Sequence, residues 1–130
     1  MTVATSNAAM IEEGYSLFAA GDIEGVFALF SPEIVWTIPG PKLIEGEYRG
    51  HAELAGFFAK LQEAWQSQEL ELEHVLGEGD VVVALGRHHI GLNDRTYVVP
   101  FAHAWRVVDG LAVSFREYTD TAEFERMLAA

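Results

Sequence analysis

Hydrophobic residues recur at helical spacing in the first half of the chain. Over residues 6–20 they share one helical face, which carries Ala8, Ile11, Tyr15 and Phe18. A second predicted helix begins at Asp22, a suitable N-cap, and ends at Ser31-Pro32. The strongest helical pattern follows it, and it predicts a third helix through Leu54, Phe57, Phe58, Leu61 and Trp65.

Alternation of apolar and polar residues indicates β-strands in most of the remaining chain. Residues 33–38 predict a first strand, and residues 48–50 a short extended partner. Longer strands are predicted over residues 69–76, 81–90, 95–108 and 111–118, with turns at 91–94 and at Asp109-Gly110. In residues 69–76, His74 falls in the phase of the leucines. Asp120 and Glu123 have the spacing of a capping box, which predicts a short terminal helix.

This order of elements predicts an α+β fold. The three N-terminal helices would pack against one face of a curved antiparallel sheet, and a sheet folded around helices forms a cone with an apolar interior. A chain of 130 residues is large enough for a substantial core but too short for two ordinary domains. We therefore expect a single domain over residues 1–130.

The last hairpin allows two registers, and the choice decides which side chains enter the cone. A two-residue turn at Asp109-Gly110 would place Trp105 on the same face as Ser114. A three-residue loop with Gly110 in a bulge separates apolar from polar residues better, so we favour it. Its inner face carries Phe101, His103, Trp105, Val107, Leu111, Val113, Phe115 and Glu117, and its outer face Ala102, Ala104, Arg106, Ala112, Ser114 and Arg116.

Two titratable groups then interrupt an apolar face, which is a common pattern in acid–base sites. Desolvation would raise the pKa of Glu117 towards the range useful for proton transfer, and His103 could hydrogen-bond it. Arg87 or His89 could stabilise developing negative charge. His88 and His89 alternate, so one of them at most faces inward, and we expect a bulge opposite them at Pro100. The other reading makes His103 a core residue and lets Glu117 reach solvent or an arginine.

Large side chains at the mouth of the cone are candidates for contact with a substrate. These are Tyr15, Trp36, Phe57, His74, Phe101, Trp105 and Phe115. The same residues could equally be core, and His74 could be core or pocket lining. Five histidines and many carboxylates leave a metal site open, but the spacing places no two imidazoles on one helical face or, apart from cross-strand pairs, on one strand face. We therefore expect neither a metal nor a cofactor.

Charge and composition exclude several classes of protein. The chain has 20 acidic and 8 basic residues and a net charge of −12, which argues against nucleic-acid and anionic-membrane partners. It has no cysteine, so disulfides and thiolate sites are excluded. No segment is apolar for long enough to span a bilayer, and residues 1–10 lack the basic residue of a signal peptide. We expect a cytoplasmic protein.

Several runs, in this order and spacing, resemble the nuclear transport factor 2-like (NTF2-like) superfamily over nearly the whole chain. They are residues 19–25, Phe27-Ala28-Leu29-Phe30, Tyr48-Arg49-Gly50, Phe57-Phe58 and residues 105–110. The ending, residues 115–120, is similar to the SnoaL-like branch, which is related to polyketide cyclases and ketosteroid isomerases. The resemblance implies a cone-shaped α+β barrel with an internal pocket, and a homodimer through the outer sheet face.

The resemblance does not extend to the steroid isomerase mechanism. The positions that look like its catalytic base, oxyanion tyrosine and protonated aspartate hold Ile38, Gly14 and Ala102. Epoxide hydrolase-like members carry Arg-x-Asp and Trp-Arg-Asp-Tyr runs, which look like residues 87–89 and 115–118 here, with His and Glu in place of the two aspartates.

Polyketide cyclases of the SnoaL type use a late-strand aspartate as acid and base near an inward histidine. Glu117 and His103 look like those two positions. We therefore expect acid–base chemistry on a small apolar molecule that contains a carbonyl group, with Glu117 as base and His103 as its partner. Isomerisation, cyclisation and hydration stay open, and so does the alternative of a non-catalytic binding or dimerisation module.

Overall fold

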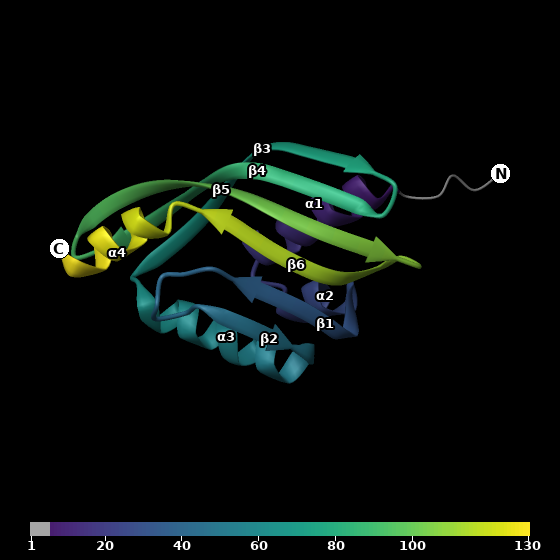
Figure 1. The fold of residues 1–130 in the computed structure, drawn as a ribbon, viewed down its shortest axis with the longest axis horizontal. Coiled ribbons are helices and arrows are strands. Elements are labelled where there is room, and N and C mark those ends of the chain that lie inside the picture. The colour runs from purple at the N-terminus through teal and green to yellow at the C-terminus, as the bar shows by residue number, and fades with distance from the viewer. Residues whose placement is uncertain (1–5) are drawn as a thin grey trace.

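A computed structural model describes residues 6–130, so the expectation about a signal peptide in residues 1–10 lies partly outside the described residues. Four helices and six strands follow the predicted order (Figure 1). They are α1 (Asn7–Ala19), α2 (Ile23–Ala28), β1 (Phe30–Ile38), β2 (Gly46–Arg49), α3 (Gly50–Ala64), β3 (Ser67–Glu78), β4 (Val81–Leu92), β5 (Arg95–Val108), β6 (Leu111–Thr119) and α4 (Thr121–Ala129). The second helix ends earlier than predicted, at Ala28, because β1 already begins at Phe30.

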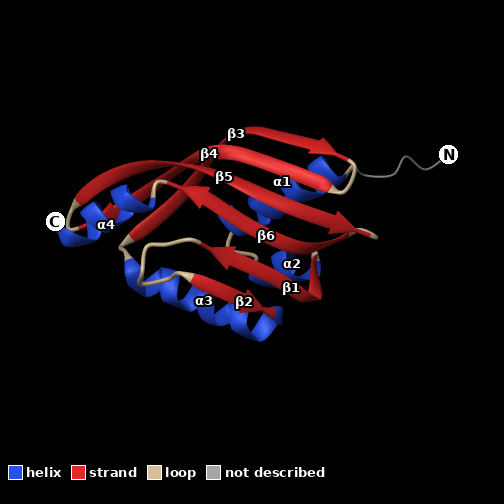
Figure 2. Cartoon of the chain, in the orientation of Figure 1, coloured by secondary structure: helices blue, strands red, loops and turns tan. Residues whose placement is uncertain are grey.

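The six strands form one open sheet in the order β2-β1-β6-β5-β4-β3. Strand β1 runs parallel to β6, and the other neighbours are antiparallel, so the sheet is mixed rather than purely antiparallel as predicted. The long strands curve, and α1, α2 and α3 lie on one side of them (Figure 2). The predicted α+β architecture, a curved sheet packed against three N-terminal helices, is confirmed.

Side-chain caps define where three helices begin. The Ser6 hydroxyl accepts a hydrogen bond from the Ala9 amide, and Asp22 and Asp120 accept from the amides of Gly25 and Glu123. Each cap satisfies an amide that the first helical turn would leave without a partner. The caps predicted at Asp22 and Asp120 are therefore present, and Ser6 caps α1 in the same way.

The β5–β6 hairpin has a different register from the one we favoured. Asp109 and Gly110 both have positive φ, 51° and 79°, and form a two-residue turn in which Val108 pairs with Leu111. A bulge then shifts the pairing between Arg106 and Val107. Val113 is the extra residue on β6, so the ladder moves by one residue, and Phe115 and Glu117 share a face with Trp105 and His103 as predicted. The prediction for Ala112 was wrong, because Ala112 is fully buried on the inner face.

A second bulge lies in β3 and redirects His74. Leu72 pairs with Gly86 and His74 pairs with Leu85, so Glu73 is an extra residue between them. The side chains after it change face, and His74 is exposed rather than part of the cone interior. The bulge also brings β3 close to Gly86, where a Cβ atom would overlap the Glu71 carbonyl oxygen and lie 2.8 Å from Cζ of Phe101.

Buried aromatic rings fill much of the space between sheet and helices. Trp36 stacks on Phe115 with ring centroids 3.7 Å apart, and Trp105 meets Phe115 edge-on at 4.7 Å. Within residues 6–130, no helix has both the length and the apolar character needed to cross a membrane.

Replacing Gly86 by alanine should destabilise the fold by about 2–3 kcal/mol, because the new methyl group overlaps backbone that the sheet holds in place. Urea unfolding would measure this loss. Gly56→Ala is the matched control, since Gly56 lies in α3 with open space around it and alanine favours helix by up to about 1 kcal/mol. Equal stability of the two variants would contradict the close approach at Gly86.

Candidate functional site

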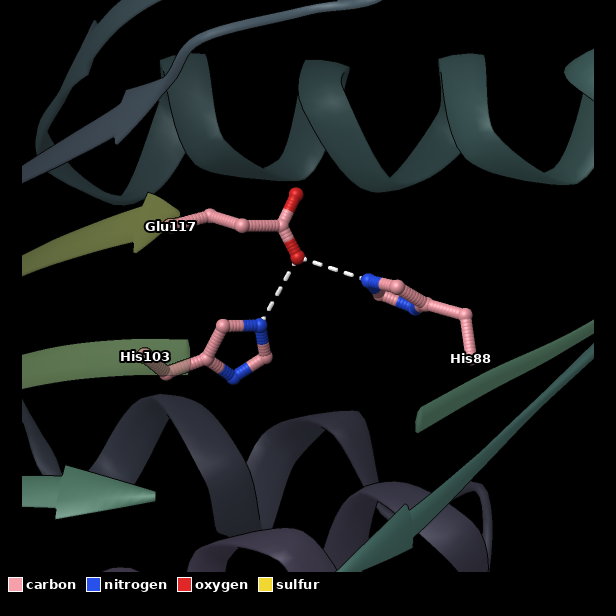
Figure 3. A group of neighbouring side chains, drawn as sticks. All are labelled: His88, His103 and Glu117. Carbon is pink, nitrogen blue, oxygen red and sulfur yellow. Dashed lines mark hydrogen bonds and ion pairs between the residues drawn. The ribbon is translucent and has the colours of Figure 1, made fainter. Parts of the chain in front are cut away.

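Three neighbouring strands bring one carboxylate and two imidazoles together inside the cone. Glu117 comes from β6, His103 lies opposite it on β5, and His88 comes from β4. Oε2 of Glu117 lies 2.8 Å from Nε2 of His103 and 2.7 Å from Nε2 of His88 (Figure 3). All three residues are at most 7% exposed.

Each imidazole continues into a further buried hydrogen bond. Nδ1 of His103 lies 2.6 Å from the Tyr15 hydroxyl, which accepts from the Trp105 indole N–H at 3.1 Å. On the other side, Nδ1 of His88 lies 3.0 Å from Nε2 of Gln68. The Gln68 carbonyl oxygen in turn accepts from the Trp65 indole N–H at 3.3 Å.

The two tryptophans determine the direction of these hydrogen bonds, because an indole nitrogen can only donate. Trp65 donates to the carbonyl oxygen of Gln68, so the Gln68 amide group donates to Nδ1 of His88. Trp105 donates to Tyr15. Burial lowers the pKa of His103, so its ring is neutral, and with Nε2 donating to Glu117 the Tyr15 hydroxyl donates to Nδ1. Both imidazoles are therefore neutral, with the proton on Nε2, and both donate to the same oxygen of Glu117.

These two donors hold Glu117 ionised. Burial alone would raise the pKa of its carboxyl group, but the hydrogen bonds from His103 and His88, together with the electrostatic attraction of the two imidazoles, lower that pKa to about 2. The expectation that the Glu117 pKa is raised was therefore wrong. Burial lowers the pKa of His103 against the opposing effect of Glu117, and burial raises the pKa of Tyr15. At neutral pH the cluster carries one negative charge.

An interior cavity of about 80 Å³ adjoins the cluster. Apolar side chains make up most of its wall, and the polar residues that line it are Tyr15, Gln68, His88, His103 and Glu117. A larger groove of about 550 Å³, the mouth groove, borders the cavity. The two share five wall residues, which are Phe18, Phe58, Leu61, Trp65 and Gln68. The cluster therefore lines a recess that adjoins a groove walled by residues of α1, α2 and α3.

The second carboxylate oxygen of Glu117, Oε1, can accept a hydrogen bond from a ligand in the cavity. Oε1 makes no hydrogen bond within residues 6–130, and it is turned away from both imidazoles (Figure 3). Trp36 also lines the cavity, and its buried Nε1 has no acceptor in the described part of the chain. The recess thus offers one free acceptor in apolar surroundings, and Nε1 of Trp36 is an unpaired donor that its neighbours cover.

The structure places the predicted site residues in three groups. Glu117 and His103 meet as predicted, and the cavity is lined by Tyr15, Trp36, Phe57, Trp105 and Phe115. Phe101 does not line the cavity but stacks on His103 at 4.0 Å. Arg87 and His89 were placed wrongly, since both lie on the outer sheet face and bind Glu71.

His88 is the member of the cluster that was not predicted from the sequence. Pro100 makes no bulge, because the β4–β5 ladder runs without a shift from Val81 to Leu92. The signal was present in the sequence: His88 has the same parity as Val82, Ala84 and Ile90, and all three are fully buried. Counting alternate residues along β4 would have selected His88 over His89.

The cluster also brings three metal-ligating side chains together, with ligand atoms within 4.8 Å of one another. A metal ion would need the lone pairs of both Nε2 atoms. Their protons would have to move to Nδ1, where the N–H of His88 would face the amide N–H of Gln68. The residues present therefore fit hydrogen bonding to Glu117 better than metal ligation.

Acid should destabilise the fold through Glu117. Because its pKa is lowered from 4.5 to about 2, the ionised group stabilises the fold fully above pH 4.5 and progressively less as the pH falls towards 2. The shift corresponds to roughly 3 kcal/mol. Denaturant unfolding at each pH should show this loss in wild type and a flatter profile in Glu117→Gln. Exposed Glu69→Gln should retain the wild-type profile, and parallel profiles of wild type and Glu117→Gln would contradict the assignment.

Comparison with known proteins places this geometry in a family. The family model of the SnoaL-like domain matches residues 11–115. No curated protein sequence matches the chain. An NTF2-like protein from Burkholderia pseudomallei is 30% identical with a TM-score of 0.89, over 97% of this chain and 100% of that one.

Two further solved structures are similar over almost their whole length. TerC, co-crystallised with polyporic acid, is 27% identical with a TM-score of 0.87, over 93% of this chain and 96% of that one. An NTF2-like protein from Burkholderia thailandensis is 25% identical with a TM-score of 0.89, over 96% of this chain and 98% of that one. The chain belongs to the SnoaL-like domain family of NTF2-like proteins.

Proposed function

We propose that this chain is an enzyme that transfers a proton at a carbon atom beside a carbonyl group in a small apolar molecule. Glu117 is the base and acts through Oε1, and His103 is its hydrogen-bonding partner. The proposal depends on the different surroundings of the two carboxylate oxygens. Oε2 accepts hydrogen bonds from two imidazoles, whereas Oε1 accepts none from the described residues and lies beside an apolar cavity. A base held in this way is positioned before substrate arrives.

An unpaired donor beside the same cavity supports a carbonyl-containing substrate. A carbonyl oxygen would satisfy Nε1 of Trp36, which has no acceptor among the described residues, once the side chains that cover this atom move apart. That hydrogen bond would draw electron density from the carbon beside the carbonyl group and make its proton more acidic. One donor for the oxygen and one base for the proton are the two groups that enolisation requires.

The ionised state of Glu117 narrows the range of substrates. A carboxylate whose pKa is about 2 is always in its basic form at neutral pH, but it binds a proton weakly. It is suited to protons that the substrate already holds loosely, such as those on a carbon between two carbonyl groups. We therefore favour activated dicarbonyl compounds over simple ketones.

A non-catalytic binding module is the second candidate, and the same low pKa favours it, because a weak base transfers protons slowly. The co-crystal of TerC with polyporic acid supports ligand binding in the fold and is compatible with either candidate. Only turnover separates the two.

Exchange of the proton beside the carbonyl group in heavy water, followed by NMR over a panel of cyclic and acyclic dicarbonyl compounds, tests the proposal. Glu117→Gln keeps an oxygen for both imidazoles to donate to but removes the base, so enzyme-catalysed exchange should fall at least about 100-fold. His103→Gln should lower it less, and exposed Glu69→Gln should leave it unchanged. Exchange that is equally fast with Glu117→Gln would remove Glu117 from the mechanism.

The homodimer implied by the family resemblance is also part of the proposal. A cross-strand row on the outer sheet face carries Leu85, Ala102 and Tyr118, and Leu85 and Tyr118 are exposed apolar residues. Light scattering should give twice the chain mass of 14.4 kDa. Leu85→Asp should shift the protein to monomer, whereas Leu43→Asp, at an exposed residue outside the sheet, should not. A monomeric wild type would exclude the dimer.

A further inference from the structure

Among residues 6–130, no cation lies beside the buried negative charge of Glu117. His88 is neutral because Gln68 donates to its Nδ1, and His103 is neutral because burial lowers its pKa, so the Tyr15 hydroxyl donates to Nδ1 of His103. The described residues that line the cavity include no lysine or arginine. Two N–H donors reduce the cost of burying the carboxylate, but they do not neutralise it, and buried charges in proteins are normally paired.

The walls around this charge are suited to an organic cation. Five of the lining residues are Tyr15, Trp36, Phe57, Trp105 and Phe115, whose ring faces attract a positive charge. An aromatic wall with one carboxylate at its inner end binds the apolar body of an ammonium ion by packing and the ammonium group by an ion pair. The same wall gives an anionic ligand nothing to pair with.

The position of the charge also favours an ammonium group over a metal ion. A metal ion needs lone pairs on Nε2 of His88 and His103, and both atoms carry protons that are committed to Oε2. An ammonium group needs only an acceptor, and Oε1 of Glu117 makes no hydrogen bond with any residue of the range 6–130. Binding there leaves every hydrogen bond from Trp65 to Trp105 in place.

We propose that this cavity binds small apolar primary amines in their protonated form, with the ammonium group donating to Oε1 of Glu117. This goes beyond the proposed function and does not depend on turnover. The ammonium proton would lie where Oε1 would meet the proton of a carbonyl substrate, so such amines should also compete with that substrate. With about 80 Å³ inside, the cavity takes the charged end and a few carbon atoms, and the rest of the ligand extends past Phe18, Phe58 and Leu61 into the mouth groove.

Three probes of one shape but different charge test the proposal: benzylamine, benzyl alcohol and benzoate. Isothermal titration calorimetry at pH 7 should show benzylamine binding wild type at least about tenfold more tightly than benzyl alcohol, and benzoate binding most weakly. Glu117→Gln should reduce the preference for the amine to about one. Glu69→Gln, which removes one exposed acidic group, should keep it. Equal binding of amine and alcohol by wild type, or an unchanged preference in Glu117→Gln, overturns the proposal.

A second measurement uses wild type alone, so the proposal can be tested even if the Glu117→Gln variant does not fold. Raising the pH of wild type until benzylamine loses its proton should abolish the preference over benzyl alcohol, because Glu117 stays ionised while the ligand loses its positive charge. A preference that persists in the neutral amine overturns the proposal. Titration with Co²⁺ is the third arm, and an absorption spectrum of tetrahedral nitrogen and oxygen ligation would overturn the choice of an organic cation over a metal ion.

The tests of amine binding and of catalysed proton exchange can fail independently of each other. Catalysed exchange without selective amine binding would leave the proposed function standing and remove this inference. Selective amine binding that depends on Glu117, without exchange on any dicarbonyl compound, would retain the inference and remove the enzyme.

Discussion

A single carboxylate oxygen organises the interior of this protein. Oε2 of Glu117 accepts from His88 on β4 and from His103 on β5, so three strands are connected at one atom on the concave face of the sheet. The two tryptophans at the outer ends can only donate, which leaves the carboxylate as the common acceptor of both chains of hydrogen bonds. Losing that acceptor would leave two buried N–H groups without partners, and each such group costs about 1–3 kcal/mol.

Much of the fold and half of the cluster could be predicted from alternation alone. Glu117 and His103 were assigned to the correct face even though the turn was wrong, because the bulge in β6 restored the parity on which the prediction depended. The same reasoning failed for His74, since the extra residue Glu73 reverses the faces of β3 after it. Bulges depend on how neighbouring strands coil, and one strand's sequence does not show that.

The electrostatics of the site were harder to predict than its position. Burial of Glu117 could be inferred from the sequence and argued for a raised pKa, but the sign of the shift depends on how many donors reach the carboxylate. His88 supplies the second donor. It could not be assigned to the inner face from the sequence, because a bulge was expected at Pro100, and the structure has no bulge there. The choice between His88 and His89 therefore decided both the membership of the cluster and its charge.

The tryptophans around the cavity make the fluorescence of the protein sensitive to what the cavity contains. The chain has three tryptophans, and Trp36, Trp65 and Trp105 all line the cavity. Two of these indoles donate into the chains that end on Glu117, and Trp65 also borders the mouth groove. Every source of indole fluorescence in the protein therefore borders the same recess, so its native emission follows the occupancy and protonation of that recess rather than an average over the molecule.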